Sequence, residues 1–190
     1  VTKDAEVKAL VEAAIKRFGR VDILVNNAGY THKNQPMLNV GEAEFDKIFA
    51  VNVKAIYLAA RHVVPVMRKQ GGGVILNPVS TAAIRPRPGL TWYNSSKGAA
   101  QTMTKSMAAE LAPDKIRVVA VNPVIVETGL LEHFMGMPDT PENRQKFVAT
   151  IPLGRMSTPK DVAQAALFLC SDDAQFLTGV CMEVDGGRCI

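Results

Sequence analysis

The strongest constraint on the fold is an alternation between short, nearly continuous apolar runs and longer stretches whose apolar residues keep helical spacing. The clearest apolar run is VDILV at 21–25, which is typical of a strand buried on both faces of a sheet. Pro78 weakens another run, because proline cannot donate a hydrogen bond to a sheet ladder. Strands are predicted at 21–25, 74–79, 116–121 and 180–184, and helices at 1–19, 42–69, 93–111 and 160–169.

Strands that alternate with helices favour right-handed crossovers onto a mostly parallel sheet, so the predicted fold class is α/β. A length of 190 residues suits one ordinary domain, and 1–190 is predicted to be a single domain. A hydrophobic fraction of 47% and a charged fraction of 21% are close to the globular average, which excludes a disordered chain. The longest apolar stretch, 118–126, is far too short to span a membrane, so no membrane partner is expected.

Charge and cysteine content exclude further classes of partner and site. The chain has 22 basic and 18 acidic residues, scattered along the sequence, so no nucleic-acid partner is expected. Three cysteines without close pairing are typical of free thiols in a reducing compartment, and a cytoplasmic location is predicted. The three histidines lack the spacing of metal ligands, so no metal site is expected.

The segment 125–157 has a looser pattern than the rest of the chain, with several glycines and prolines. It follows the predicted strand at 116–121, and open α/β sheets bind ligands at the carboxyl ends of their strands. We therefore predict that 125–157 is a substrate-binding lid. The alternative is an ordinary surface excursion.

Tyr93 and Lys97 are the first candidates for chemistry. They lie four residues apart near the start of a predicted helix, so both side chains project from one face and can meet. A phenol with its ordinary pKa of about 10 exchanges protons poorly at neutral pH. A neighbouring ammonium favours the phenolate, so Lys97 is expected to lower the pKa of Tyr93.

Three other features gain weight beside this pair. Ser80 follows the strand at 74–79, where its hydroxyl can donate to a substrate carbonyl oxygen. Asn52 lies inside an apolar helical stretch, so its amide either bonds a neighbouring backbone or serves a site. A run of two amides and two small residues ends the first predicted strand, either as a plain turn or as a surface where a flat ligand approaches the backbone. This run is Asn26, Asn27, Ala28 and Gly29.

In residue type, order and spacing, these features resemble the short-chain dehydrogenase/reductase family over essentially the whole chain. The resemblance implies a Rossmann-like, doubly wound parallel sheet. It also implies an oxidoreductase that transfers a hydride between NAD or NADP and a small-molecule carbonyl or secondary alcohol. The matching segments are NNAG at 26–29, NVK at 52–54, Ser80, YNSSK at 93–97, NPVIVET at 122–128 and TGVCMEVDGG at 178–187.

The resemblance implies a role for each matching residue. Tyr93 would be the general acid in reduction and the base in oxidation, while Lys97 would lower its pKa and hold the nicotinamide ribose. Ser80 would orient and polarise the substrate oxygen, and Asn52 would support a water that links Lys97 to solvent. The other expected cofactor contacts are Asn26, Asn27, Ala28 and Gly29 on the adenosine side, and Val126 and Thr128 at the nicotinamide carboxamide and the nearby phosphate, with Pro123 beside them.

The chain departs from the family pattern at three places. Val124 replaces a glycine beside the expected nicotinamide position, and Pro78 replaces a β-former, which is expected to adjust the approach of Ser80. The family's N-terminal strands, helices and glycine-rich phosphate loop are absent from this chain, so 21–25 is expected to form an exposed apolar edge. We expect these residues to belong to a longer, active protein; the alternative is a non-catalytic fragment acting as a structural or interaction subunit.

The substrate and the cofactor preference stay open at this level. A reductase of acyl thioesters is an alternative to one of sugars, steroids or alcohols. Trp92 and His32 are expected to border the pocket together with Arg85 and Arg87, which either attract an acidic substrate group or are simply solvated. Family members commonly form tetramers through two long helices and the last strand, so a homo-oligomer, tetramer or dimer, is expected.

Overall fold

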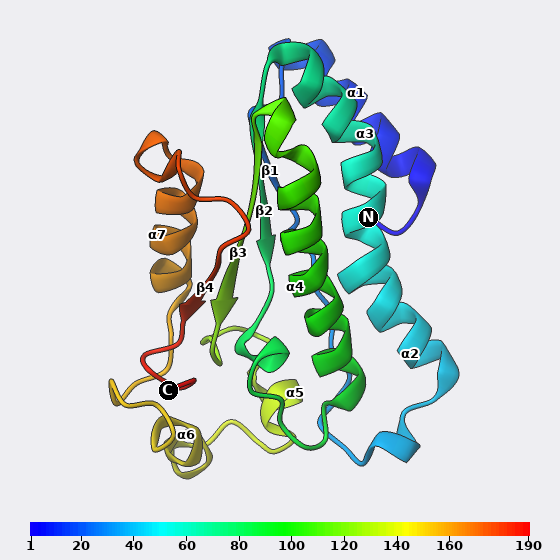
Figure 1. Cartoon of the computed structure of the whole chain (residues 1–190). Helices are drawn as coiled ribbons and strands as arrows, with labels where there is room; N and C mark the ends of the chain where they lie inside the picture. The colour runs from blue at the N-terminus through cyan, green and yellow to red at the C-terminus, as the bar shows by residue number, and fades with distance from the viewer.

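The computed structural model describes residues 1–190, and its centre is a parallel sheet of four strands in the order β1-β2-β3-β4. This confirms the predicted α/β class. The register pairs Leu24 with Ile75 and Ile75 with Val118, so all strands end at the same edge of the sheet (Figure 1). The strands are β1 (Ile23–Val25), β2 (Gly73–Pro78), β3 (Ile116–Pro123) and β4 (Cys181–Val184).

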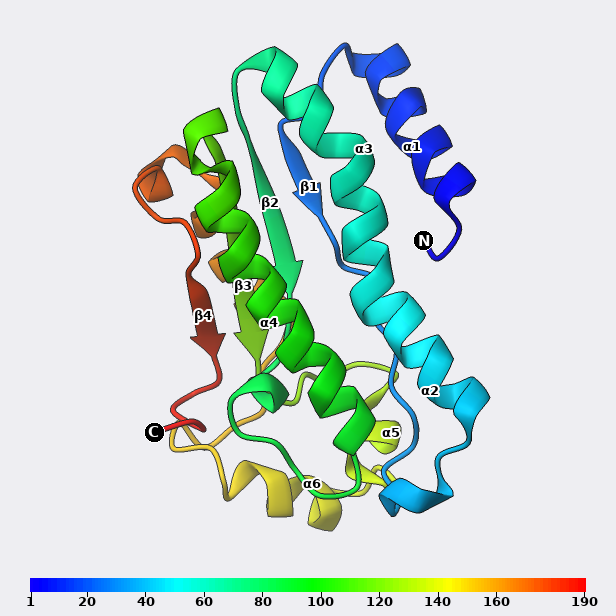
Figure 2. The same cartoon turned by 45° about the vertical axis from the view of Figure 1, so that its right-hand side comes forward.

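Helices cover both faces of the sheet, as in a doubly wound Rossmann-like fold (Figures 1 and 2). Strand side chains alternate between the faces, so Ile75 and Val118 pack on the side of α1, α3 and α4. Leu76 and Val119 point the other way and pack against Leu169 of α7. The helices are α1 (Asp4–Phe18), α2 (Glu42–Phe49), α3 (Ala55–Gln70), α4 (Thr91–Leu111), α5 (Leu131–Met135), α6 (Pro141–Val148) and α7 (Pro159–Cys170).

Every predicted strand and helix is present, with boundaries shifted by a few residues. The helix expected at 42–69 is continuous in the fold, but a π-helical turn at Ala50–Lys54 joins α2 to α3. Gly19 and Gly71 end α1 and α3 with φ values of 80° and 88°, a left-handed conformation that costs glycine little.

The prediction that 21–25 is buried on both faces is wrong, whereas the prediction of an exposed apolar edge is confirmed. β1 pairs only with β2, and the side chains of Ile23 and Val25 are 47% and 48% exposed. An apolar run shows that a strand can be buried, but its place in the strand order decides whether it is.

One helical stretch, Glu42–Gln70, is long and apolar enough by length and composition to cross a membrane. In the fold, Ile56, Val63 and Met67 of this stretch are buried against the sheet. A helix of a protein core meets the same criterion, and this packing is that of a core helix.

Candidate active site

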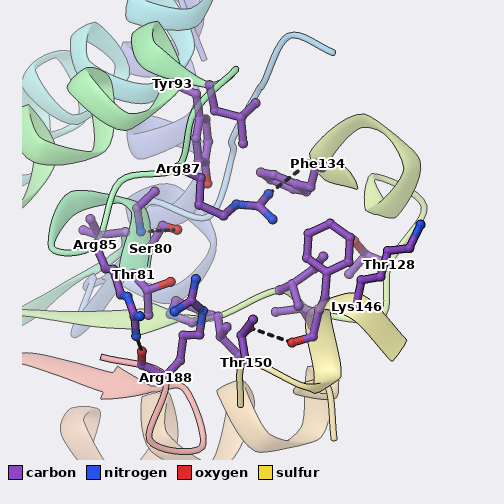
Figure 3. Close-up of a pocket in the computed structure, with 18 residues that line it drawn as sticks. Ser80, Thr81, Arg85, Arg87, Tyr93, Thr128, Phe134, Lys146, Thr150 and Arg188 are labelled. Carbon is purple, nitrogen blue, oxygen red and sulfur yellow. Dashed lines mark hydrogen bonds between the residues drawn. The ribbon is translucent and has the colours of Figure 1, made fainter. Parts of the chain in front are cut away.

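A cavity of about 370 Å³ lies at the carboxyl edge of the sheet, where the loops after β2 and β3 meet the start of α4 (Figure 3). Such an edge is where open parallel sheets bind ligands. Ser80 enters the cavity from the turn after β2, and its Oγ accepts a hydrogen bond of 3.1 Å from the Ala82 N–H. Tyr93 enters from the first turn of α4, so the structure brings these two predicted residues into one cavity.

Tyr93 is held firmly in this wall. Its side chain is buried, and its ring meets the Phe134 ring edge-on with centroids 5.3 Å apart. Burial raises the pKa of Tyr93 to about 12, although the Ser80 hydroxyl and the Arg87 guanidinium act in the opposite direction. The net shift is therefore opposite to the one expected from Lys97, because loss of water around the phenolate dominates.

Lys97 lies one helical turn further along α4 and is also buried. Its Nζ donates a hydrogen bond of 3.0 Å to the carbonyl oxygen of Pro78, and burial lowers the pKa of Lys97 to about 8. A methyl group on Gly29 would lie 3.9 Å from this Nζ, so the ammonium sits against the NNAG backbone. An ammonium has three donors, which leaves Lys97 able to bind further oxygens there.

Asn52 is buried in the π-helical turn, a feature often found at functional sites. Its Oδ1 accepts a hydrogen bond from the Tyr30 N–H, and its Nδ2 donates to the Tyr30 carbonyl oxygen, both at 2.8 Å. Nδ2 also donates to the Ser96 Oγ at 2.9 Å. Of the two open interpretations, bonding to a neighbouring backbone is therefore observed, and the water-supporting role stays a prediction.

The first residue of the NNAG run is fixed by hydrogen bonds to the core, and the other three are exposed. The Asn26 Nδ2 donates to the Asn77 Oδ1 at 2.8 Å, and the Asn77 Nδ2 donates to the Thr104 Oγ1 at 3.0 Å. This chain of bonds fixes the end of β1 to β2 and α4. Asn27, Ala28 and Gly29 are exposed beyond it, which leaves their backbone open to a ligand.

The segment after β3 forms the opposite wall of the cavity. Pro123, Val126 and Thr128 line it, and Val124, the departure from the family's glycine, lines it too. Pro78 ends β2, where it pairs with Val121, so the proline that weakened the strand prediction occupies the last position of the ladder.

Sequence reasoning missed several cavity residues and misplaced two. Arg85 and Arg87 line the cavity as expected, but Trp92 and His32 do not. The Trp92 Nε1 donates to the Met37 carbonyl oxygen instead, and His32 is buried. The missed residues lie far along the chain, where no local motif marks them: Phe134, Lys146, Phe147, Thr150 and Arg188.

A family model described as enoyl-(acyl carrier protein) reductase matches residues 1–188. The 4-formylbenzenesulfonate dehydrogenase of Comamonas testosteroni is 53% identical over 188 residues, which are 99% of this chain and 75% of that protein. The chain belongs to the short-chain dehydrogenase/reductase family. This confirms the resemblance drawn from the motifs and makes the chain part of a family of oxidoreductases.

Other short-chain dehydrogenases/reductases share both sequence and fold with this chain. The 3-oxoacyl-(acyl-carrier-protein) reductase of Thermotoga maritima is 40% identical over 190 residues, covering 100% of this chain and 75% of that protein. The crystal structure of a 3-ketoacyl-(acyl-carrier-protein) reductase from Brucella melitensis, complexed with NADH, superposes with a TM-score of 0.93 at 51% identity. It covers 100% of this chain and 76% of that one, so the Rossmann-like fold is confirmed.

Proposed function

We propose that this protein transfers a hydride between a nicotinamide cofactor and a carbonyl or secondary-alcohol substrate, with Tyr93 as the general acid and base. The observation that carries the proposal is the buried Tyr93 in the cavity wall beside Ser80, one helical turn from Lys97. One hydroxyl comes from the turn after β2 and the other from the first turn of α4, so both lie at the ligand edge of the sheet, where they can bind one reacting oxygen.

The residues around Lys97 fit the ribose side of a nicotinamide cofactor. Gly29 leaves the backbone uncovered, and the buried Lys97 ammonium beside it has donors to spare for hydroxyl groups. The cofactor is NAD or NADP, which supplies or accepts the hydride when bound. The residues that would hold it are Asn26, Asn27, Ala28, Gly29, Tyr93, Lys97, Pro123, Val126 and Thr128.

The chain's own residues would handle the proton. In reduction, Ser80 donates to the substrate oxygen and Tyr93 passes its phenolic proton to that oxygen as negative charge develops there. A pKa of about 12 keeps the phenol protonated and ready for this direction. In oxidation, the phenolate form of Tyr93 accepts the proton from the alcohol, and Ser80 and Arg87 favour the phenolate because they lower the pKa of Tyr93. Lys97 would hold the nicotinamide ribose, and Asn52, which bonds the Tyr30 backbone, would support a water that links Lys97 to solvent.

The segment 125–157 is proposed to act as the substrate lid. Val126, Thr128, Phe134 and Phe147 of this segment line the cavity, so it forms one wall of the substrate site. We also propose that the protein works in the cytoplasm as a tetramer or dimer. The exposed apolar side chains of Leu167 and Phe176, near the last strand, support such an assembly.

Replacement of Tyr93 by phenylalanine tests the proposed chemistry, because it removes the proton and keeps the ring that packs on Phe134. In the intact protein, kcat for hydride transfer is expected to fall by about a thousandfold or more. The dissociation constant of the cofactor, measured by fluorescence titration, is expected to change by less than about twofold, since one hydrogen bond is lost. Turnover that survives in Tyr93→Phe would refute the acid/base role. Absence of cofactor binding in the unaltered protein would favour a structural or interaction subunit.

A further inference from the structure

The proposed substrate cavity has an unusual charge pattern: four basic side chains line it and no acidic residue does (Figure 3). They come from three separate parts of the chain, the loop after β2, α6 and the C-terminal tail. The four are Arg85, Arg87, Lys146 and Arg188. Like charges that converge on one small cavity repel one another, and a negative charge bound among them relieves this repulsion.

Other arginines near this cavity are neutralised by carboxylates. Arg144 pairs with Asp139 at 2.5 Å and with Glu127 at 3.4 Å, and Arg155 pairs with Asp161 at 2.7 Å. None of the four cavity cations forms an ion pair with this chain. Simple solvation is the common state of exposed basic side chains, but Arg87 is partly buried.

Arg87 is fixed in a position to receive an anion. Its Nη2 donates to the Phe134 carbonyl oxygen at 2.8 Å, and its guanidinium lies 5.0 Å from the centre of the Phe147 ring. Burial and the nearby Arg188 both lower the pKa of Arg87, because they disfavour its positive charge. The fork of the guanidinium has donors left over, which match a carboxylate or a sulfonate.

The rest of the cavity wall favours a substrate with a flat, apolar skeleton. Leu90, Ile125, Phe134 and Phe147 line it, and a volume of about 370 Å³ lies at the lower end of small-molecule pockets. In Figure 3 the Arg87 guanidinium lies beside the Phe134 ring, so an anion bound to Arg87 lies next to an apolar surface. A small ring compound satisfies both the space and the surface.

We propose that the substrate is a small ring-containing carbonyl compound or alcohol with a carboxylate or sulfonate group, which Arg87 and Arg188 bind. This inference rests on the proposed function, because it assumes that the reacting oxygen lies at Tyr93. The phosphates of the cofactor are a second source of negative charge. The exposed NNAG residues, expected on the adenosine side, do not line this cavity, whereas Pro123, Val126 and Thr128, expected to contact the cofactor, do. Cofactor binding by the arginine variants therefore distinguishes the two sources of negative charge.

The test compares two aldehydes that differ in one charge, 4-formylbenzoate and its methyl ester, with the intact protein and reduced cofactor. The ratio of kcat/KM for the acid to that for the ester is expected to exceed about ten. Arg87→Met and Arg188→Met are expected to lower this ratio at least about tenfold, since each removes a charged hydrogen bond. The control Arg61→Met removes the same charge from the exposed face of α3 and should leave the ratio unchanged.

Two further measurements separate this inference from the proposed function. If neither aldehyde is turned over, calorimetry compares the binding of terephthalate with that of terephthalamide. Tighter binding of terephthalate, weakened in Arg87→Met, would support the anion site even though the proposed function had failed. A ratio near one that Arg87→Met does not alter would overturn the anion site, although turnover would uphold the function. Weaker cofactor binding in Arg87→Met, with the aldehyde ratio unchanged, would assign the cations to the cofactor phosphates and overturn the inference.

Discussion

At the residue scale, the pair Tyr93 and Lys97 illustrates how burial sets chemistry. Their spacing of four residues follows from the sequence, but the pKa values of about 12 and about 8 follow from the lack of water around both groups. Both shifts favour the neutral side chain, so neither group carries a stable charge without cost in the folded protein. Such shifts are typical of a functional site whose polar groups bind a ligand.

The shift at Lys97 predicts a pH dependence of stability. The folded protein loses this proton near pH 8 and the unfolded chain near its ordinary value of 10.5, so between these values the unfolded state binds more protons. The contribution of Lys97 to the free energy of unfolding is therefore expected to rise with pH across this window, by up to about 1.4 kcal/mol per pH unit. Urea unfolding between pH 7.5 and 9.5 measures it as the difference from Lys97→Met, because the raised pKa values of the cysteines and Tyr93 lower stability with rising pH equally in both proteins.

Lys97→Met is expected to abolish this rise, because it removes the titrating group and keeps the apolar stem. Lys105→Met, at an exposed position of the same helix, is the matched control and should retain it. A rise that persists in Lys97→Met would show that another group causes it.

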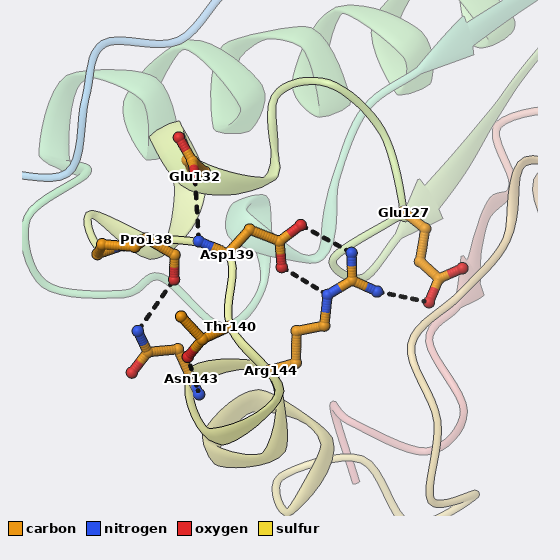
Figure 4. A network of polar contacts seen from close by, with 7 residues as sticks. All are labelled: Glu127, Glu132, Pro138, Asp139, Thr140, Asn143 and Arg144. Atoms are coloured by element: carbon orange, nitrogen blue, oxygen red, sulfur yellow. Dashed lines mark hydrogen bonds and ion pairs between the residues drawn. The ribbon is translucent and has the colours of Figure 1, made fainter.

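At the scale of elements, a polar network holds the 125–157 segment together (Figure 4). Arg144 of α6 bridges Asp139 and Glu127, which lie on either side of α5. Glu132 accepts a hydrogen bond of 3.0 Å from the Asp139 N–H, and Thr140 caps α6. Since α5 and α6 are short, such contacts rather than helix length stabilise the segment.

Arg144→Met is expected to loosen this wall of the cavity without unfolding the protein. Amide hydrogen exchange across 127–144 should become faster by about three- to tenfold, and KM for the substrate should rise while kcat changes less. Arg68→Met breaks a comparable ion pair with Asp114, remote from the cavity, and should leave both quantities unchanged. Unaltered exchange in Arg144→Met would mean that apolar contacts, such as those of Leu131 and Met135, hold the segment by themselves.

At the scale of the whole molecule, β1 is the edge strand of the sheet within these 190 residues. Two apolar side chains of β1, Ile23 and Val25, are about half exposed. On the face of the sheet to which they point, the long helix is α7. An apolar strand edge is a template for pairing with another chain.

The 190-residue chain is therefore expected to self-associate, and a charge on β1 should reduce this. Val25→Lys is expected to raise the monomer fraction at micromolar concentration several-fold, as charged edge strands do in natural sheets. Leu10→Lys places the same charge at an exposed apolar position of α1 and should have little effect. Sedimentation velocity measures the fraction, and equal association in both variants would locate the contact elsewhere, for example at Phe176.

The sequence by itself determined the fold class, the positions of the strands and long helices, and the family. These depend on local signals: apolar periodicity, glycine stops and motifs that span a few residues, such as YNSSK at 93–97. It also placed Ser80 and Tyr93 at one edge, because parallel strands all end on the same side. The sequence did not predict the π-helical turn around Asn52, because one extra residue in a turn leaves the apolar pattern of 42–70 unchanged.

Only the tertiary structure decided the direction of the pKa shift at Tyr93 and the charge of the cavity. Each of these depends on which segments meet in space, not on the residues beside them in the chain. Arg87 and Arg188 are separated by about half the chain, yet they face one cavity without a carboxylate between them. Burial and electrostatic interactions act through space, so a chain read in order does not show them.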